Sequence, residues 1–135
     1  MSIDSFDFAT GKTIDTRKRR VILSDIDMDD LSAIQKVLRE LRFTILGKEQ
    51  SLRALLELVR KHKIGVLMLD IDNPEVNIDE HLPAIQEKFP EMLVILMSAK
   101  ADKAIFQKSI TMGAAGFLVR PINPDSLKKV LSTIE

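Results

Sequence analysis

The chain of 135 residues contains no cysteine, tryptophan or tyrosine, and six phenylalanines are its only aromatic side chains. Without cysteine it can form neither disulfides nor thiolate metal sites, and a domain of this length buries enough surface to fold without them. No apolar run approaches the roughly 20 residues that span a bilayer, and the first residues do not resemble a signal peptide. We therefore expect a cytoplasmic protein with no membrane partner.

An excess of charge of either sign is also absent, because 20 basic side chains balance 20 acidic ones. Broad affinity for nucleic acid or anionic lipid needs a surplus of lysine and arginine. The residues from Arg17 to Arg20 form a basic run. Because the chain as a whole is neutral, we interpret this run as a solvent-exposed segment before the first strand. We expect no nucleic-acid partner, and another protein or a small ligand instead.

Short apolar runs alternate with longer amphipathic stretches from residue 20 onward. The runs predict strands, and the stretches have the helical period, as in the stripe of Leu31, Ile34 and Leu38. Residues 1–19 have no useful period and predict a flexible N-terminal tail, so that residues 20–135 form the domain. The five predicted strands are Val21–Leu23, Phe43–Leu46, Val66–Leu69, Met92–Met97 and Phe117–Val119.

Three of these strand runs are apolar throughout, as required in a sheet that helices cover on both faces. Five β-α units then give a three-layer α/β domain, with a doubly wound, five-stranded parallel sheet and right-handed crossovers. Helix boundaries agree with this division. Asn123 precedes Pro124 as an N-cap precedes proline in the first turn, and Gly113 follows the last periodic residue of its segment.

Polar side chains follow four of the predicted strands: Asp25 and Asp27, Asp70 and Asp72, Ser98, and Arg120. The carboxyl ends of parallel strands meet at one edge of a sheet. Carboxylates gathered there repel one another unless a cation lies among them, and Mg²⁺ is the natural choice, with Arg120 as a second positive charge. Such a site suits phosphoryl transfer, in which an aspartate acts as nucleophile and becomes an acyl phosphate.

The order of these residues resembles the receiver domain of bacterial two-component response regulators, over roughly residues 20–134. The resemblance is carried by Asp25, by Asp70 with Pro74 four residues later, by Ser98-Ala99 and by Arg120-Pro121. It implies a flavodoxin-like fold with strand order 2-1-3-4-5. It also implies that Asp70 is the phosphoacceptor, that Asp25 belongs to the acidic Mg²⁺ pocket, and that Asp72 helps to bind the ion through its main-chain carbonyl.

The resemblance assigns roles to four further residues. Ser98 matches the switch hydroxyl that moves onto the phosphoryl group, and Phe117 matches the aromatic side chain that follows it inward. Arg120 stands where the family has lysine, and Pro121 follows it through a cis peptide bond.

Three departures from the family pattern accompany these matches. The second acidic residue after the first strand, a direct metal ligand, is replaced by Ile26. Asp27 lies one residue further on, but its spacing to Asp30 is also typical of a helix N-cap with an acidic first turn. Arg120 presents a wide planar fork instead of a compact ammonium group. Asn77-Ile78 occupies the stretch where the family has Asp-Gly.

Two non-enzymatic functions therefore stay open. In the first, the chain is part of a phosphorelay: Asp70 takes a phosphoryl group from a sensor histidine kinase or phosphotransfer protein, and Ser98 and Phe117 shift an output face. In the second, the chain is a degenerate, phosphorylation-independent protein-binding module, with a standing ion pair between Arg120 and Asp70 in place of the metal. For both functions, the resemblance implies that a downstream protein target, or a second copy in a homodimer, binds to one face. That face is formed by the fourth helix, the fifth strand and the fifth helix.

A third hypothesis comes from another class of protein. Leu23 to Asp27 is an apolar strand followed by Asp-x-Asp, which resembles the first motif of haloacid-dehalogenase-type phosphatases, with Asp25 as nucleophile and Asp27 as general acid. The chain is short for that family, and the segment from Asp70 to Pro74 would have no role in it. The receiver hypothesis explains more of the sequence.

Overall fold

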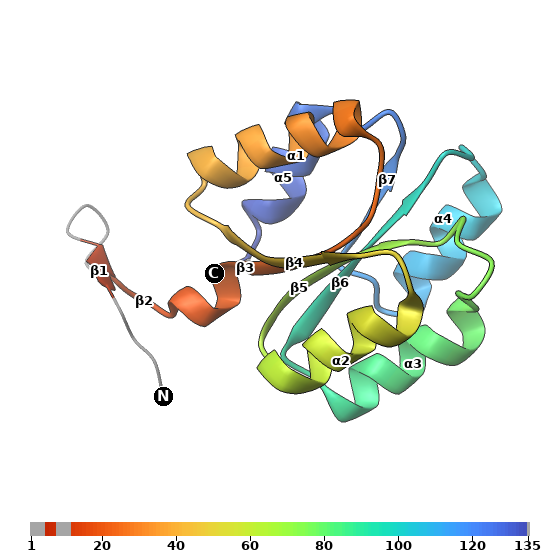
Figure 1. Ribbon diagram of the computed structural model, residues 1–135, viewed down its shortest axis with the longest axis horizontal. Coiled ribbons are helices and arrows are strands. Elements are labelled where there is room, and N and C mark those ends of the chain that lie inside the picture. The colour runs from red at the N-terminus through yellow and green to blue at the C-terminus, as the bar shows by residue number, and fades with distance from the viewer. Residues whose placement is uncertain (1–4, 8–11, 135) are drawn as a thin grey trace.

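The computed structural model describes residues 5–7 and 12–134, with side chains from residue 15 onward. Five parallel strands form the central sheet, in the order β4-β3-β5-β6-β7 (Figure 1). Their bounds are β3 (Arg20–Ser24), β4 (Thr44–Glu49), β5 (Gly65–Asp70), β6 (Met92–Ser98) and β7 (Gly116–Val119). Counted within the sheet, this is the expected order 2-1-3-4-5, so the predicted flavodoxin-like fold is confirmed.

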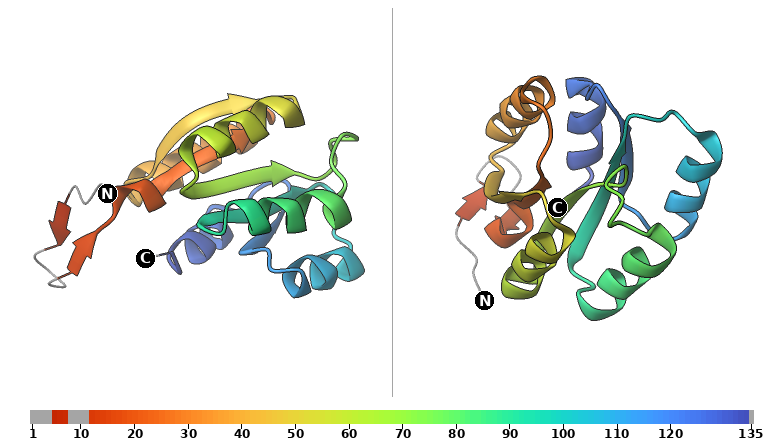
Figure 2. Two further views of the ribbon diagram at one scale, coloured as in Figure 1. Left: turned by 90° about the horizontal axis from the view of Figure 1, so that it is seen from below. Right: turned by 45° about the vertical axis from the view of Figure 1, so that its right-hand side comes forward.

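Helices cover both faces of the sheet (Figures 1 and 2). On one side lie α1 (Met28–Glu40) and α5 (Pro124–Leu131), and on the other lie α2 (Leu52–His62), α3 (Ile78–Lys88) and α4 (Lys103–Thr111). Alternate residues of each central strand enter opposite cores: Val21 and Leu23 pack toward α1, whereas Ile22 packs toward α2, and all three are fully buried. Each such side chain contributes about 1.5–3 kcal/mol to folding.

The helix boundaries lie where the sequence signals place them. The Asn123 side chain accepts hydrogen bonds from the main-chain N–H groups of Asp125 and Ser126 and caps α5. Gly113 follows α4 with φ of 99°, a left-handed conformation that glycine adopts without strain. The Asp27 side chain accepts a hydrogen bond from the N–H of Asp30 at 2.9 Å and caps α1. Asp27 therefore has the N-cap role that its spacing to Asp30 indicated.

Strand β4 differs from its prediction. It was expected at residues 43–46, but it begins at Thr44 and continues through the polar residues Lys48 and Glu49. As an edge strand, β4 is only partly buried and does not need an apolar sequence along its whole length. A register irregularity opposite Val21 and Ile22 also lets it run further beside β3. The carboxyl end of β4 therefore contributes a lysine to the edge where the other strands end.

In the N-terminal segment β1 (Ser5–Asp7) pairs with β2 (Lys12–Ile14) in antiparallel orientation, and the 3-10 helix η1 (Thr16–Arg19) comes before β3. The predicted tail, residues 1–19, thus falls partly outside the described residues. Within the basic run, Arg17 pairs with Asp15, and Arg19 donates to the carbonyl of Leu41 at 3.1 Å. These two guanidinium groups stabilise the approach to β3.

None of the helices in the described part of the chain combines the length and the apolar character needed to cross a bilayer.

Candidate functional site

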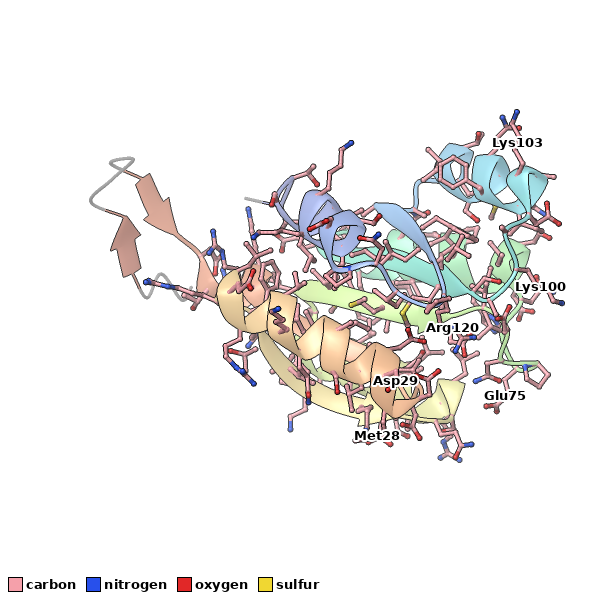
Figure 3. All side chains as sticks on the ribbon, turned by 90° about the horizontal axis from the view of Figure 1, so that it is seen from above. Met28, Asp29, Glu75, Lys100, Lys103 and Arg120 are labelled. Atoms are coloured by element: carbon pink, nitrogen blue, oxygen red, sulfur yellow. The ribbon has the colours of Figure 1, made fainter. Side chains whose placement is uncertain are left out.

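The predicted site residues gather at the carboxyl edge of the sheet. Asp70 ends β5, Ser98 ends β6, Asp25 follows β3, and Arg120 follows β7. Figure 3 shows the same end of the domain, where Arg120 lies between the start of α1, labelled at Met28 and Asp29, and the loops that carry Glu75 and Lys100. The parallel pairing of the strands aligns these termini, so residues from four segments meet although they are far apart in sequence.

Asp70 is held by its own turn and by Arg120. Its main-chain N–H donates to Ser24 Oγ at 3.0 Å, and its Oδ1 accepts from the N–H of Asp72 at 2.9 Å. The same oxygen lies 3.3 Å from Arg120 Nη2, and the side chain is only 16% exposed. Oδ2 of Asp70 accepts no hydrogen bond from any residue in the described ranges. Oδ1 of Asp70 therefore has two polar partners, and Oδ2 has none among the described residues.

The side chain of Asp72 makes more polar contacts than any other predicted site residue. Oδ1 accepts from the hydroxyl of Ser98 at 2.8 Å. Oδ2 accepts from the N–H of Ala99 at 2.7 Å and from Arg120 Nη2 at 2.9 Å. Partial burial raises the pKa of Asp72, but the hydrogen bonds from Ala99, Ser98 and Arg120 outweigh it and hold the pKa below its usual range. The carboxylate is consequently charged at neutral pH.

Ser98 joins Asp72 to the loop between β6 and α4. The serine is only 2% exposed, and its Oγ accepts from the N–H of Lys100 at 3.0 Å while its hydroxyl donates to Asp72. The resemblance assigned Asp72 a role through its main-chain carbonyl and did not reveal this use of its side chain. Its position two residues after Asp70, where a turn can carry the side chain toward β6, is the only sequence signal for it.

Arg120 bridges two carboxylates with one nitrogen. Its side chain is 17% exposed, and Nη2 contacts both Asp70 and Asp72, whereas Nε is buried without a hydrogen-bond partner. The peptide bond to Pro121 is cis, as the family resemblance implied. The next residue, Ile122, donates its N–H at 2.7 Å to the carboxylate of Asp30, which is 3% exposed. This bond ties the end of β7 to the first turn of α1.

Asp25 lies at the more open side of the site. Its side chain is 46% exposed, and Oδ1 lies 3.7 Å from Lys48 Nζ, a residue that the shorter prediction for β4 had missed. Asp25, Asp70 and Asp72 line one hollow of about 500 Å³, together with Ser24, Gln50, Ser51, Asn73, Pro74 and Glu75. The structure thus brings the three predicted acidic residues to one pocket, where Asp70 and Asp72 share Arg120 and Asp25 lies beside Lys48.

The donor set of this pocket does not fit Mg²⁺. The ion requires a near-octahedral shell of oxygens at about 2.0–2.1 Å. Within residues 5–7 and 12–134, no group of three or more Asp, Glu, His or Cys side chains is placed to hold a metal ion. Ile26 follows Asp25 where the family has a ligand, so one carboxylate of the family's acidic set is missing. Arg120 provides the positive charge that the two nearer carboxylates require.

Phe117, the predicted switch aromatic, lies on β7 beneath α4. It is partly buried, and its ring packs edge to face against Phe106, with centroids 5.8 Å apart. Phe106, Ile110 and Val119 are 42–44% exposed and leave apolar surface on α4 and β7. Lys108 of this region pairs with Asp79 of α3 at 2.7 Å. The exposed apolar side chains thus lie on α4 and β7, and Lys108 joins α4 to α3.

Comparison with known proteins agrees with this architecture. A family model described as the response regulator receiver domain matches residues 21–132. The transcriptional regulatory protein CitT of Bacillus subtilis is 30% identical over 89 residues, which make up 66% of this chain and 39% of CitT. The two-component response regulator ARR12 of Arabidopsis thaliana is 28% identical over 113 residues, 82% of this chain and 19% of ARR12. The chain thus spans only a minor part of the length of these relatives.

Solved structures share the fold. A response regulator from Thermotoga maritima superposes with a TM-score of 0.71 at 22% identity, covering 86% of this chain and 96% of that one. A CheX-CheY-BeF3-Mg complex from Borrelia burgdorferi gives a TM-score of 0.71 at 20% identity, covering 98% of both chains. Since the family model covers all five helices and the whole sheet except Arg20, the chain belongs to the response regulator receiver domains of two-component signal transduction.

Proposed function

We propose that this receiver domain is a protein-interaction module whose binding surface is set without Mg²⁺-dependent phosphorylation of Asp70. The observation that carries the proposal is the bridge from Arg120 Nη2 to both Asp70 and Asp72. The bridge offsets part of the negative charge of the site from within the chain, because one guanidinium group lies against both carboxylates. This is the phosphorylation-independent binding module expected from the sequence, in which Arg120 pairs with Asp70. In the structure Arg120 also pairs with Asp72.

The physical basis is the balance of charge in a partly buried site. Receiver domains generally bind Mg²⁺ at an acidic pocket, where the ion offsets repulsion between carboxylates. Here the guanidinium group offsets it, and the bridged side chains are only 16–25% exposed, so water screens the attraction incompletely. An ion entering the pocket would meet an Asp70 carboxylate that is already paired with the Arg120 guanidinium group.

The surface of α4 and β7 supports a protein partner. Receiver domains interact with histidine kinases or phosphotransfer proteins. In this chain Phe106, Ile110 and Val119 expose apolar area there, and Lys103 at the start of α4 is exposed beside them. An apolar centre that contains aromatic side chains, within a polar rim, is typical of protein interfaces. We assign this face to a downstream protein target with acidic residues around an apolar centre.

A second candidate is phosphoryl acceptance by Asp70, and one feature favours it. Oδ2 of Asp70 accepts no hydrogen bond in the described part of the chain, and the side chain lines an open hollow of about 500 Å³. That oxygen is available as a nucleophile toward a phosphoryl group. The positive charge of Arg120 would then stabilise the product.

One experiment separates the two candidates. The chain and its Asp70→Asn variant are incubated with acetyl phosphate, with and without Mg²⁺, and their intact masses are measured. The interaction module predicts no added phosphoryl group and no heat of Mg²⁺ binding by calorimetry. A mass gain of one phosphoryl group in the wild type, absent from Asp70→Asn, would establish the second candidate instead.

A further inference from the structure

We propose that the end of the domain opposite the acidic pocket binds the phosphate backbone of double-stranded DNA without sequence preference. This surface, the basic end, consists of residues 17–20, 39–42 and 60–63. It joins η1 to the C-terminal ends of α1 and α2, at the edge of the sheet where the strands begin (Figure 1). The inference goes beyond the proposed function and does not depend on it, because the acidic pocket and the surface of α4 and β7 take no part.

Hydrogen bonds hold the three segments of the basic end together. Arg19 Nη1 donates to the carbonyl of Leu41 at 3.1 Å, and Arg20 Nη2 donates to the carbonyl of Ile64 at 3.3 Å. The first bond ties η1 to the end of α1, and the second ties the start of β3 to the residue after the third segment. Residues that are about 20 positions or more apart in sequence therefore form one continuous surface.

Positive charge is concentrated on this surface. Nine of its twelve residues are lysine or arginine, and its single acidic residue, Glu40, pairs with Lys128 at 3.2 Å. Arg17 pairs with Asp15 at 2.8 Å. Six further cations are exposed and form no ion pair with any residue in the described ranges, namely Lys18, Arg39, Arg42, Arg60, Lys61 and Lys63.

Helix dipoles explain only a small part of this charge. The C-terminus of a helix carries about half a negative charge, so the ends of α1 and α2 together balance about one cation. The six exposed cations exceed this several-fold. Their field reaches His62, whose pKa is lowered by burial and further by the charges of Arg20 and Lys61. The surplus of positive charge is available to an anionic ligand.

The neutrality of the whole chain, from which no nucleic-acid partner was expected, averages over two ends of opposite charge. The six residues of β5 separate the basic end from the acidic pocket by about 20 Å. Salt at physiological ionic strength screens exposed charges beyond about 8 Å. A ligand at the basic end therefore experiences the cations there and little of the carboxylates of Asp25, Asp70 and Asp72.

Two of the exposed cations occupy left-handed backbone positions. Arg42 has φ of 62° after α1, and Lys63 has φ of 64° after α2, whereas α4 is followed by Gly113 with φ of 99°. Glycine adopts this conformation without the steric cost that a Cβ atom brings. The chain thus keeps a positive charge at two helix ends where the backbone favours glycine, and retained strain of this kind is typical of functional sites.

The basic end lacks the exposed apolar surface that other partners would use. Exposed large apolar side chains of the described residues lie in other segments, namely Met28, Leu93, Phe106, Ile110 and Val119. A protein interface has an apolar centre, binding at a membrane surface inserts apolar side chains, and single-stranded nucleic acid stacks on aromatic rings. The backbone of a DNA duplex requires only cations. A duplex is therefore the partner that fits this surface.

The test is fluorescence anisotropy of a labelled DNA duplex of mixed sequence, titrated with the full chain at several salt concentrations. If four to six phosphates are neutralised, the plot of log K against log[salt] should have a slope of about −4 to −5. The affinity should then fall at least about 100-fold between about 50 mM and about 200 mM salt. A second duplex of unrelated sequence should bind with the same affinity.

A double variant separates binding from folding. Arg42→Gly with Lys63→Gly removes two cations and relieves both left-handed positions, so its urea midpoint should stay at or above that of the wild type. Its salt slope should be smaller by about 2. Arg53→Gln with Lys100→Gln removes two exposed cations near the carboxyl edge, so it is the matched control and should bind as the wild type does. If the glycine variant does not fold, Lys18→Gln with Lys61→Gln is measured in its place.

Three results would overturn the proposal. The first is the absence of saturable, salt-dependent binding by the wild type. The second is an equal loss of affinity in the glycine variant and in the control, since net charge alone would then set the affinity. The third is tighter binding to poly-L-glutamate or to phosphatidylserine vesicles than to the duplex, which would assign the basic end to a different anionic partner.

Discussion

Replacing Arg120 by methionine removes the cation that bridges Asp70 and Asp72. The contact to Asp72 is a charge-assisted hydrogen bond of 2.9 Å, and the contact to Asp70 is longer, at 3.3 Å. A hydrogen bond to a charged group contributes roughly 1.5–3 kcal/mol to stability, and partial exposure reduces this. The variant also removes the buried Nε, which has no partner, and this offsets part of the loss. We expect a net destabilisation of about 2 kcal/mol.

The measurement is urea unfolding followed by far-ultraviolet circular dichroism, because the chain has no tryptophan. With a slope of roughly 1–3 kcal/mol per molar urea, the midpoint should fall by about 1 M. Lys108→Met is the matched control. This variant breaks the ion pair between Lys108 and Asp79, whose two side chains are 46% and 65% exposed. Such surface ion pairs contribute about 0–1 kcal/mol to the free energy of unfolding.

A double variant tests whether the effect comes from the unpaired carboxylate. In Arg120→Met with Asp72→Asn, the second change removes the charge that the first leaves without a partner. The combined loss should therefore be smaller than the sum of the two single losses by about 1 kcal/mol. The reasoning would be refuted if Arg120→Met unfolded at the wild-type midpoint, or if it were no more destabilising than Lys108→Met.

Three further predictions concern neighbouring groups. Asp30→Ala leaves the buried N–H of Ile122 without its acceptor and should cost about 1–3 kcal/mol by urea unfolding, with Asp30→Asn less affected. Because the folded pKa of Asp72 is lowered, its contribution to stability should be present above the unfolded pKa of about 3.9 and lost as pH falls through the folded value. Carboxyl NMR titration of Asp72 and urea unfolding against pH check this, and a folded midpoint above that of an unfolded peptide would contradict it. Ile26→Asp combined with Arg120→Lys introduces the two residues that the family has at these positions. Calorimetry should then detect Mg²⁺ binding to the double variant and none to the wild type. Equal heats of Mg²⁺ binding in both proteins would contradict the conclusion that the wild-type pocket does not fit Mg²⁺.

Much of the fold could be predicted from local patterns. The middle residues of the central strands β3, β5 and β6 are buried almost without exception, so these stretches had to be apolar, and their sequences show it. Asn123 and Gly113 mark helix ends through hydrogen bonds and backbone angles that depend on only a few neighbouring residues. Strand β4 was placed less well because an edge strand tolerates polar residues, which removes the contrast between strand and loop.

For the site, the sequence alone determined which residues arrive at the carboxyl edge of the sheet, because strand order and direction follow from the pattern of apolar runs and the family resemblance. Only the tertiary structure decided how those residues satisfy one another. Whether Asp72 offers its carbonyl to a metal or its carboxylate to Ser98 depends on how the turn after β5 packs against β6. Such distances arise from contacts between residues 26 or more positions apart, and no local pattern encodes them.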